Sequence, residues 1–336
     1  MKWLENLNAL EMDITSYCNA ACPSCRRTHH LHSNELELTH FSLDTWKRLW
    51  TEDLIDANIT KLVLNGNWGD SMMHKDILEM LEYPIKHNPN IKLMIDTNGG
   101  MRREPFWESF AEILNSQYKN PIVRFGIDGT DNYTNGIYRV DVLYDQVLRN
   151  AGVFIEGGGI AQWRFTVFDH NVHQIHDAHD IAERMGFEQF KSRKSYARRI
   201  YAPGDKLVAT TYCYDSMKPK DIFIHDKFPN RKFHKGYPYV DPPYQESKCI
   251  WYRENRIQID PYGNIWPCCH ISGLLMNTEN LDIKLDSWNK YGFKHNNINH
   301  RSLGDILQDS YFTKEIPNAV DEARWKPCRD ICGVQK

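Results

Sequence analysis

Three cysteines near the amino terminus are spaced so that they could ligate one metal cluster. They form the run Cys18-Asn-Ala-Ala-Cys22-Pro-Ser-Cys25, directly after an apolar segment with strand character. Thiolates at these spacings on a loop can converge on one face of a cubane iron–sulfur cluster, for which Cys is the usual ligand. Three ligands leave one iron open to a small chelating molecule. A zinc site is the alternative because His29 and His30 could supply a fourth ligand, although zinc favours four ligands and paired spacing.

A second group of cysteines lies near the end of the chain. Cys249 is followed by thirteen residues, Gly263, four residues and Cys268, and Cys328-Arg-Asp-Ile-Cys332 comes later. Gly263 permits a tight hairpin turn that brings cysteine-bearing segments together. Four distant thiolates in one small unit indicate a second, buried [4Fe–4S] cluster, with a structural zinc site as the alternative.

Two further cysteines complete a total of nine. Cys269 adjoins Cys268 and could exchange with it as a ligand. Cys213 lies between two tyrosines, belongs to neither group, and is interpreted first as a surface thiol. An odd number of cysteines, clustered at short spacings, argues against a disulfide framework and favours metal binding or catalysis in a reducing compartment.

Alternating strand-like and helix-like segments must position the first cysteine group. Six short runs rich in Ile, Val, Leu or Phe are interpreted as strands, at Leu7–Thr15, Lys61–Gly66, Ile91–Asn98, Ile122–Asp128, Gln162–Asp169 and Gln189–Ser195. The segments between them repeat apolar residues with helical periodicity. Six such alternations predict an α/β fold in which a parallel sheet, covered by helices, curves into a partial (β/α)6 barrel of the TIM type. Chemistry in these barrels lies at the carboxyl ends of strands, where Cys18 falls.

Composition divides the chain into three predicted parts. Residues 1–200 form the barrel, and residues 249–336 form a small second domain whose strand pair, Ile257–Asp260 and Asn264–Pro267, turns at Gly263. Residues 201–248 hold six Pro, two Gly and many Lys and Tyr, and are interpreted as an irregular connector.

The bulk properties of the 336-residue chain exclude some classes of protein. A formal net charge of −3 predicts neither bulk nucleic-acid binding nor attraction to membranes. No apolar run approaches the ~20 residues that span a bilayer. The amino terminus lacks the apolar core of a signal peptide, so we expect a cytoplasmic protein.

The first cysteine group resembles the radical S-adenosylmethionine (SAM) superfamily, whose signature is CxxxCxxC after the first barrel strand. The resemblance covers most of the chain. It implies that Cys18, Cys22 and Cys25 hold a [4Fe–4S] cluster whose open iron binds SAM. One departure is Ser24, which stands where the family often has an aromatic residue packed near the adenine.

Two segments at the ends of the second and third strands resemble SAM-binding motifs of this family. The turn Gly-Asn-Trp-Gly69-Asp70 is similar to a Gly-Gly-Glu-Pro-like turn that binds the SAM ammonium group, with Asp in place of Glu. Thr97 and Asn98 end the third strand as in radical SAM proteins with auxiliary domains. Without the resemblance, Asp70 would be interpreted as an ordinary helix N-cap.

The fourth strand and the segment after it carry a further part of the resemblance. Gly126-Ile-Asp128-Gly129 is similar to a Ser-Ile-Asp-Gly motif, with Gly in place of Ser. Arg139 matches an Arg that binds the SAM carboxylate, a role that suits the planar guanidinium. The alternative for Arg139 is a solvated residue at a helix start. Asn171, after the fifth strand, is interpreted chiefly as a helix cap.

The second cysteine group resembles the SPASM/twitch auxiliary domain of radical SAM enzymes. Too few cysteines follow the opening motif for two clusters, so the chain is similar to the shortened twitch form. The resemblance implies one auxiliary [4Fe–4S] cluster with the ligands Cys249, Cys268, Cys328 and Cys332.

The resemblance also implies an activity. An electron donor such as flavodoxin or ferredoxin would reduce the first cluster, which cleaves SAM to a 5′-deoxyadenosyl radical that takes a hydrogen atom from substrate. The preferred substrate is a peptide or protein; the alternatives are a small molecule, such as a nucleotide, sugar or natural-product precursor, and a zinc-stabilised binding protein without activity. Cys213 would then be a weak candidate for a hydrogen-atom donor or cluster ligand. The basic stretch from Lys191 to Arg199 is either a solvated strand end or a contact for an anionic substrate.

Overall fold

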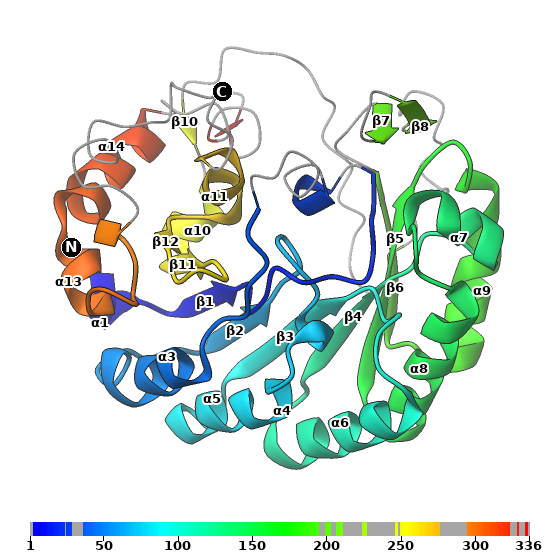
Figure 1. The fold of residues 1–336 in the computed structure, drawn as a ribbon, viewed down its shortest axis with the longest axis horizontal. Coiled ribbons are helices and arrows are strands. Elements are labelled where there is room, and N and C mark those ends of the chain that lie inside the picture. Colours follow the sequence, from blue (N-terminus) through cyan, green and yellow to red (C-terminus); the bar gives the residue numbers. More distant parts are fainter. Residues whose placement is uncertain are drawn as a thin grey trace.

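The computed structural model describes residues 3–23, 25–28, 36–194, 199–202, 206–210, 224–226, 246–247, 249–275, 294–322, 328 and 333–334. Six parallel strands, β1 to β6, lie side by side in chain order, and helices cover their convex face (Figure 1). The predicted partial barrel is therefore confirmed.

The main sheet runs in the order β12-β11-β1-β2-β3-β4-β5-β6-β9. Its strands are β1 (Ala9–Met12), β2 (Lys61–Leu64), β3 (Lys92–Thr97), β4 (Ile122–Gly126), β5 (Ile160–Val167), β6 (Gln189–Lys194), β9 (Ile224–Asp226), β11 (Arg256–Ile259) and β12 (Ile265–Trp266). Two small antiparallel pairs lie apart from it, β7 (Arg199–Ala202) with β8 (Lys206–Thr210) and β10 (Glu246–Ser247) with β13 (Gly333–Val334).

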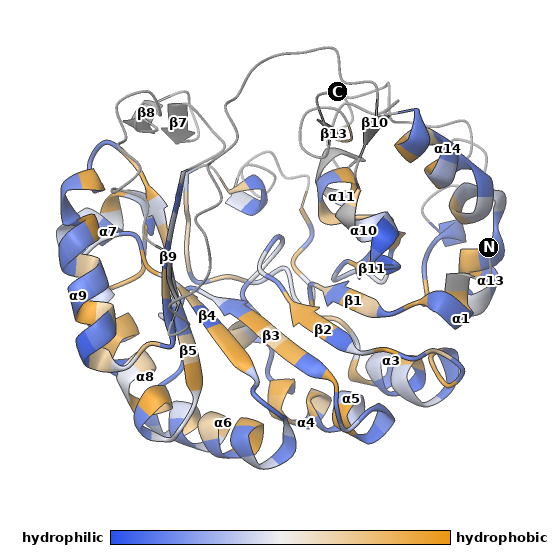
Figure 2. Cartoon of the chain, turned by 180° about the vertical axis from the view of Figure 1, so that it is seen from behind, coloured by the Kyte–Doolittle hydropathy of each residue, from blue (hydrophilic) through white to orange (hydrophobic). Residues whose placement is uncertain are grey.

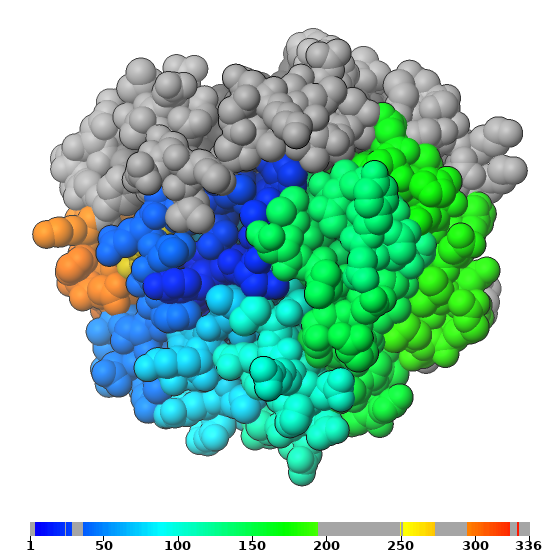
Figure 3. Space-filling view, turned by 45° about the vertical axis from the view of Figure 1, so that its right-hand side comes forward, coloured from blue at the N-terminus to red at the C-terminus, as the bar shows by residue number. Residues whose placement is uncertain are grey.

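The helices follow the strands in the order that the sequence predicts. They are α1 (Trp3–Asn6), α3 (Leu43–Arg48), α4 (Ile77–Met80), α5 (Glu82–His87), α6 (Glu104–Gln117), α7 (Asn132–Tyr138), α8 (Tyr144–Glu156), α9 (Ile175–Met185), α10 (Ile250–Arg253), α11 (Cys269–Leu275), α13 (Leu303–Gln308) and α14 (Ile316–Asp321). Short 3₁₀ segments are η2 (Ser71–Met73) and η3 (Val172–Gln174), and π-helical segments are η1 (Leu49–Asp53) and η7 (Tyr311–Glu315). Figure 3 shows helices α6 to α9 packed as one continuous outer surface.

The core lies between the sheet and these helices. Phe125 on β4 points outward and meets Trp107 on α6 and Phe154 on α8, both of which also contact Phe110. These rings are fully buried, and their edge-to-face and tilted contacts add to the stabilisation from burial. The other strand face lines the inside of the barrel and carries Asp96 on β3 and Arg124 on β4, which form an ion pair; both strands are mainly hydrophobic in Figure 2.

Strand β1 is shorter than the predicted run Leu7–Thr15. After Met12 the backbone turns to residues near the end of the cysteine loop: the Phe41 N–H donates to Ile14, and the Ser16 N–H donates to Thr39. Because these bonds replace the strand ladder, the cysteine loop is fastened at both ends to the rim of the barrel.

The predicted strand pair of the C-terminal domain extends the barrel sheet. Strand β11 pairs in parallel with β1, and β12 pairs with β11 across a turn at Gly263, whose φ of 86° suits glycine. The two units therefore share one sheet, and the boundaries at 200 and 248 stay predictions. None of the described helices has the length and apolar character that crossing a membrane requires.

A buried carboxyl group joins the two units. Asp13 is 1% exposed; it accepts hydrogen bonds from the backbone of Asn67 (2.8 Å) and Trp68 (3.1 Å) and from the side chain of Gln258 on β11 (2.8 Å). Burial raises the pKa of Asp13 well above its ordinary value of 3.8, and the hydrogen bonds from Trp68 and Gln258 oppose that rise only in part.

Replacing Asp13 should therefore affect stability in a pH-dependent way. The unfolded carboxyl loses its proton at a lower pH than the folded one, so the stability of the wild type falls as pH rises from about 4 through the folded pKa. Asp13→Asn keeps the acceptor for both backbone N–H groups and lacks this titration. Its free energy of unfolding in urea, relative to that of the wild type, should therefore rise between about pH 5 and about pH 8. Asp13→Ala should cost about 2–4 kcal/mol at about pH 5 because it leaves buried donors unpaired, and this cost should shrink toward about pH 8 because Ala also lacks the titration. If the free energies of unfolding of Asp13→Asn and the wild type differed by the same amount across this pH range, the raised pKa of Asp13 would be contradicted.

Candidate functional site

The three N-terminal thiols lie at the rim of the barrel, after β1. Cys22 is buried, and Cys18 and Cys25 are partly buried. Donors from three separate segments point at two of the sulfurs: the backbone of Ala20 (3.4 Å) and the side chain of Asn98 (3.6 Å) at Cys18 Sγ, and Arg139 Nη1 at Cys22 Sγ (3.9 Å). Hydrogen bonds to sulfur are typical of cysteines that ligate iron–sulfur clusters.

The protonation of these thiols fits a site that needs a metal. Burial raises the pKa of the Cys18 thiol to about 12 and that of Cys22 to about 11. A thiolate, the form that ligates metals, therefore requires a positive partner at this place. Among the described residues no three His, Cys, Asp or Glu side chains converge on a single ion. A cluster is ligated at separate irons, so its thiolates need not converge on one point.

Asp70 connects the ends of β2 and β3. Its carboxylate accepts hydrogen bonds from Met72 N (3.0 Å), Thr97 Oγ1 (2.9 Å) and Asn98 N (2.7 Å), and its own N–H donates to Tyr17 in the cysteine loop. The first of these bonds is the N-cap of η2 that the sequence offered as the alternative. Asp70 thus holds Asn98 beside Cys18 while its carboxylate is occupied by the protein.

Gly69 lets the turn after β2 approach the cysteine loop. A Cβ atom at this position would lie 2.3 Å from the carbonyl oxygen of Thr15 and 2.6 Å from that of Tyr17. Because both neighbours are backbone atoms, any side chain would push the turn away from the loop. The predicted SAM-binding glycine is therefore also required for packing.

Arg139 lies inside the rim. It follows α7 as its C-cap and is 19% exposed, so the alternative of a solvated helix-start residue is wrong. Its Nε donates to Asp128 (2.7 Å), a carboxylate with no exposed surface, while Nη1 reaches Cys22. Gly126 provides the space, since a Cβ atom there would lie 2.5 Å from Arg139 Nη2. The Gly that replaces the family's Ser thus makes room for the guanidinium.

Asn171 stands at the N-cap position of η3 after β5, as the sequence predicts, but its side chain makes no capping hydrogen bond. Its amide donates to the carbonyl groups of Asp128 (2.8 Å) and Thr166 (2.9 Å), and its oxygen accepts from Phe168 N. It ties the ends of β4 and β5 together behind Arg139. The sequence interpretation also missed Asn135, whose side chain accepts from Asp128 N, because neither Asn belongs to a spacing pattern.

The second cysteine group forms a cavity in the C-terminal unit. Cys249, Cys268 and Cys328 are buried and line it together with apolar side chains such as Ile271 and Ile316. Burial raises the pKa of Cys268 well above its ordinary value, and the neighbouring thiols raise it further. Cys332 and Cys213 lie outside the described residues.

Cys268 and Cys269 point to different places. Cys268 lines the cavity with Cys249 and Cys328, whereas Cys269 does not border it. The pKa of Cys269 is raised to about 12, first by burial and then by Glu11 and Asp13 inside the barrel. The start of α11 therefore presents one thiol to the cavity and the next toward the barrel.

Arg256 is a cavity residue that the sequence interpretation missed. It lines the cavity of the three thiols, and its buried Nε has no hydrogen-bond partner. The same guanidinium pairs with Glu254 and with Glu11 (3.4 Å) and lies over the Trp251 ring (5.0 Å). An unpaired buried donor beside three thiols fits a site made for an anionic cluster.

Comparison with known proteins agrees with this arrangement. A model of the SPASM family, an iron–sulfur cluster-binding domain, matches residues 249–333. The AdoMet-dependent heme synthase of Nitratidesulfovibrio vulgaris (strain Hildenborough) is 26% identical over 175 residues. The matched part covers 52% of this chain and 44% of that protein.

Solved structures share the fold over nearly the whole chain. Streptococcus suis SuiB bound to SAM superposes with a TM-score of 0.61 at 17% identity, covering 92% of this chain and 67% of SuiB. The structure of anSMEcpe with bound AdoMet gives a TM-score of 0.59 at 13% identity, covering 95% of this chain and 81% of the other.

The barrel that carries the CxxxCxxC loop at its rim shares one sheet with the matched iron–sulfur domain. Residues 249–333 match the SPASM iron–sulfur cluster-binding domain, and the chain has the fold of the SAM-bound structures named above.

Proposed function

We propose that the chain cleaves SAM at a [4Fe–4S] cluster held by Cys18, Cys22 and Cys25 and uses the 5′-deoxyadenosyl radical to take a hydrogen atom from a peptide or protein. The observation that carries this proposal is the meeting of Asn98 and Arg139 with the cysteine loop at the carboxyl ends of neighbouring strands. When bound, the cluster supplies the electron that breaks a carbon–sulfur bond of SAM.

Side chains at the rim would hold SAM in place. Arg139 donates one guanidinium nitrogen, Nε, to Asp128. Its other two nitrogens can pair with the SAM carboxylate beside Cys22. Gly69, Asp70, Thr97 and Asn98 form the opposite wall, where backbone carbonyls can accept from the SAM ammonium group. Since Asp70 already accepts three hydrogen bonds, its main task would be to orient Thr97 and Asn98.

Two changes should weaken SAM binding by related routes. Arg139→Ala removes the proposed carboxylate contact and should cost roughly 2–4 kcal/mol of SAM binding free energy. Gly126→Ala leaves every proposed contact residue in place but puts a methyl group into the space of the guanidinium, so binding should also fall. Equilibrium binding of SAM to the cluster-loaded protein measures both effects. Gly136→Ala on α7, where a Cβ atom meets nothing within 4 Å, is the matched control. Unchanged affinity in Arg139→Ala would place the SAM carboxylate elsewhere.

The C-terminal unit would hold an auxiliary [4Fe–4S] cluster. We propose Cys249, Cys268, Cys328 and Cys332 as its ligands, supported for the first three by their shared cavity. With four protein ligands its irons are occupied, so its role would be electron transfer or structural support. An electron donor such as flavodoxin or ferredoxin would supply both clusters.

The solved structures support a peptide substrate, whereas the sequence relative supports a small molecule. SuiB has been solved with the precursor peptide SuiA, and anSMEcpe with the Cp18Cys peptide, and both share this fold. A small-molecule substrate is the second candidate, because the relative that matches in sequence is a heme synthase. The experiment that separates them is a screen for a compound or peptide that stimulates 5′-deoxyadenosine formation by the reduced enzyme. A protein without iron and without this activity would contradict the whole proposal and favour the zinc-binding alternative.

A further inference from the structure

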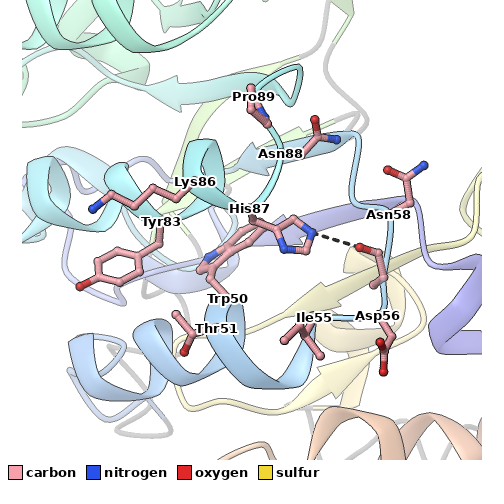
Figure 4. A pocket seen from close by; sticks show the side chains of 11 residues that line it. Trp50, Thr51, Ile55, Asp56, Asn58, Tyr83, Lys86, His87, Asn88 and Pro89 are labelled. Atoms are coloured by element: carbon pink, nitrogen blue, oxygen red, sulfur yellow. Dashed lines mark hydrogen bonds between the residues drawn. The ribbon is translucent and has the colours of Figure 1, made fainter.

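A groove on the outside of the barrel lies between η1 and α5 (Figure 4). Residues 54–60 and 87–91, which border it, lead into the amino ends of β2 and β3, so the groove is at the opposite end of the sheet from the cysteines. Its volume is about 660 Å³, within the ordinary range for binding sites. We call it the outer groove and define it by Trp50, Ile55, Asp56, Tyr83, Lys86 and His87.

The outer groove has an aromatic floor and an exposed apolar wall. Trp50 packs edge-on against the His87 ring at 5.4 Å, and His87 Nε2 bonds to the carbonyl of Ala57 (3.1 Å). Ile55 is 70% exposed, although large apolar residues are usually covered. The floor is built on η1, a π-helical segment, and such segments are frequent at functional sites.

The charges around the groove are unbalanced. Lys86 pairs with Glu82 (3.0 Å) and lies over the Tyr83 ring, so its charge is already partnered. Among the described residues, Asp56 in the groove and Glu52 beside it have no ion-pair partner. The groove therefore combines apolar surface with uncompensated negative charge.

We infer that the outer groove docks a basic segment of the substrate peptide. One apolar side chain would lie against Ile55 and the aromatic floor, and a neighbouring Lys or Arg would pair with Asp56. This inference rests on the proposed peptide substrate and adds a recognition site far from the reacting atoms. A docking site at the other end of the barrel would hold the peptide while a second part of it reaches the cysteine rim.

Direct binding tests the docking site without catalysis. The probe is fluorescein-labelled Lys-Lys-Leu-Pro-Lys-Lys, compared with Glu-Glu-Leu-Pro-Glu-Glu and with the basic peptide in which Leu is replaced by Ala, measured by fluorescence polarisation on the full chain. The basic Leu peptide should bind at least about tenfold more tightly than either comparison peptide. Asp56→Lys and Ile55→Ser, both at exposed positions, should each weaken it by about tenfold, the first by reversing the charge and the second by removing the apolar contact.

The control makes the same charge change on the far side of the barrel. Glu183→Lys on α9 should leave binding of the basic peptide unchanged. Equal loss in Glu183→Lys, or equal binding of the three peptides, would overturn the inference as non-specific attraction. The variant that lacks Cys18, Cys22 and Cys25 should bind the probe normally, so failure of SAM cleavage and failure of docking are separate results.

A second inference concerns Arg256. We propose that Arg256 is a positioning residue that raises the reduction potential of the auxiliary cluster. This inference rests on the proposal that the C-terminal unit holds such a cluster. Arg256 borders the cavity of the three thiols and its buried Nε has no partner, while Glu11, Glu254 and the Trp251 ring fix its guanidinium. Because both carboxylates offset its charge, Arg256 would act through the unpartnered N–H donor, and a hydrogen bond to a cluster favours its more negative, reduced form.

An EPR-monitored redox titration of the cluster-loaded enzyme tests this role. Arg256→Gln should lower the potential of the auxiliary signal, and Arg256→Lys should restore part of the difference. Arg253→Gln removes the same charge from an exposed position on α10 and should leave the potential unchanged. The inference is wrong if Arg256→Gln keeps the wild-type potential, or if it loses the auxiliary iron, since Arg256 would then be a structural residue.

Discussion

Replacing Cys18, Cys22 and Cys25 together with Ala should remove about four irons per chain and abolish 5′-deoxyadenosine formation. The three thiols share one loop, which is fastened to the barrel by hydrogen bonds that do not involve sulfur. The loop should therefore keep its fold when the thiols are lost. Iron analysis of the reconstituted protein and chromatographic detection of 5′-deoxyadenosine measure the two effects.

The auxiliary site is the internal control for this experiment. Its thiols lie in a separate cavity, so the triple variant should keep about four irons of the wild-type eight. Loss of all iron would show that the two sites depend on each other. A triple variant that still formed 5′-deoxyadenosine would remove the basis of the radical SAM assignment.

The sequence predicted the strands because their signal is local. Short runs of β-branched and aromatic residues, separated by helical periodicity, place β2 to β6 within about two residues of their observed bounds. The placing of motifs at strand ends follows from the same pattern, since parallel strands end at one edge of the sheet.

What the sequence could not predict depends on contacts between distant segments. The space that Gly126 leaves for Arg139 is visible only once α7 is folded back over β4. Asn is a residue type that often caps helices. The side-chain amide of Asn171 instead donates to the carbonyl groups of Asp128 and Thr166. The pairing of β11 with β1 joins residues almost 250 positions apart, a register that no local pattern encodes.

The auxiliary cysteines give the second large expected effect. Single replacements of Cys249, Cys268, Cys328 and Cys332 with Ala should each lower auxiliary iron and soluble yield, because metal binding is coupled to folding of a small domain. Cys269→Ala should be mild, since its thiol does not border the cavity shared by Cys249, Cys268 and Cys328. The measurement is the iron content of each purified variant. The variant that lacks Cys18, Cys22 and Cys25 serves as the reference for a protein that has lost only the first cluster.

The contrast between Cys268 and Cys269 is the most informative part of that series. They are adjacent in sequence and have the same chemistry, Cys268 directly before α11 and Cys269 as its first residue, so the loss of a thiol alone cannot separate them. What distinguishes the two residues is the direction of their side chains. The Cys268 thiol lies beside Cys249 and Cys328, and the Cys269 thiol lies toward Glu11 and Asp13. If Cys269→Ala lost as much iron as Cys268→Ala, the start of α11 would have to turn, and the ligand set would need revision. If every variant kept its iron, the C-terminal unit would hold no cluster at these thiols, and the proposed role of Arg256 would lose its basis too.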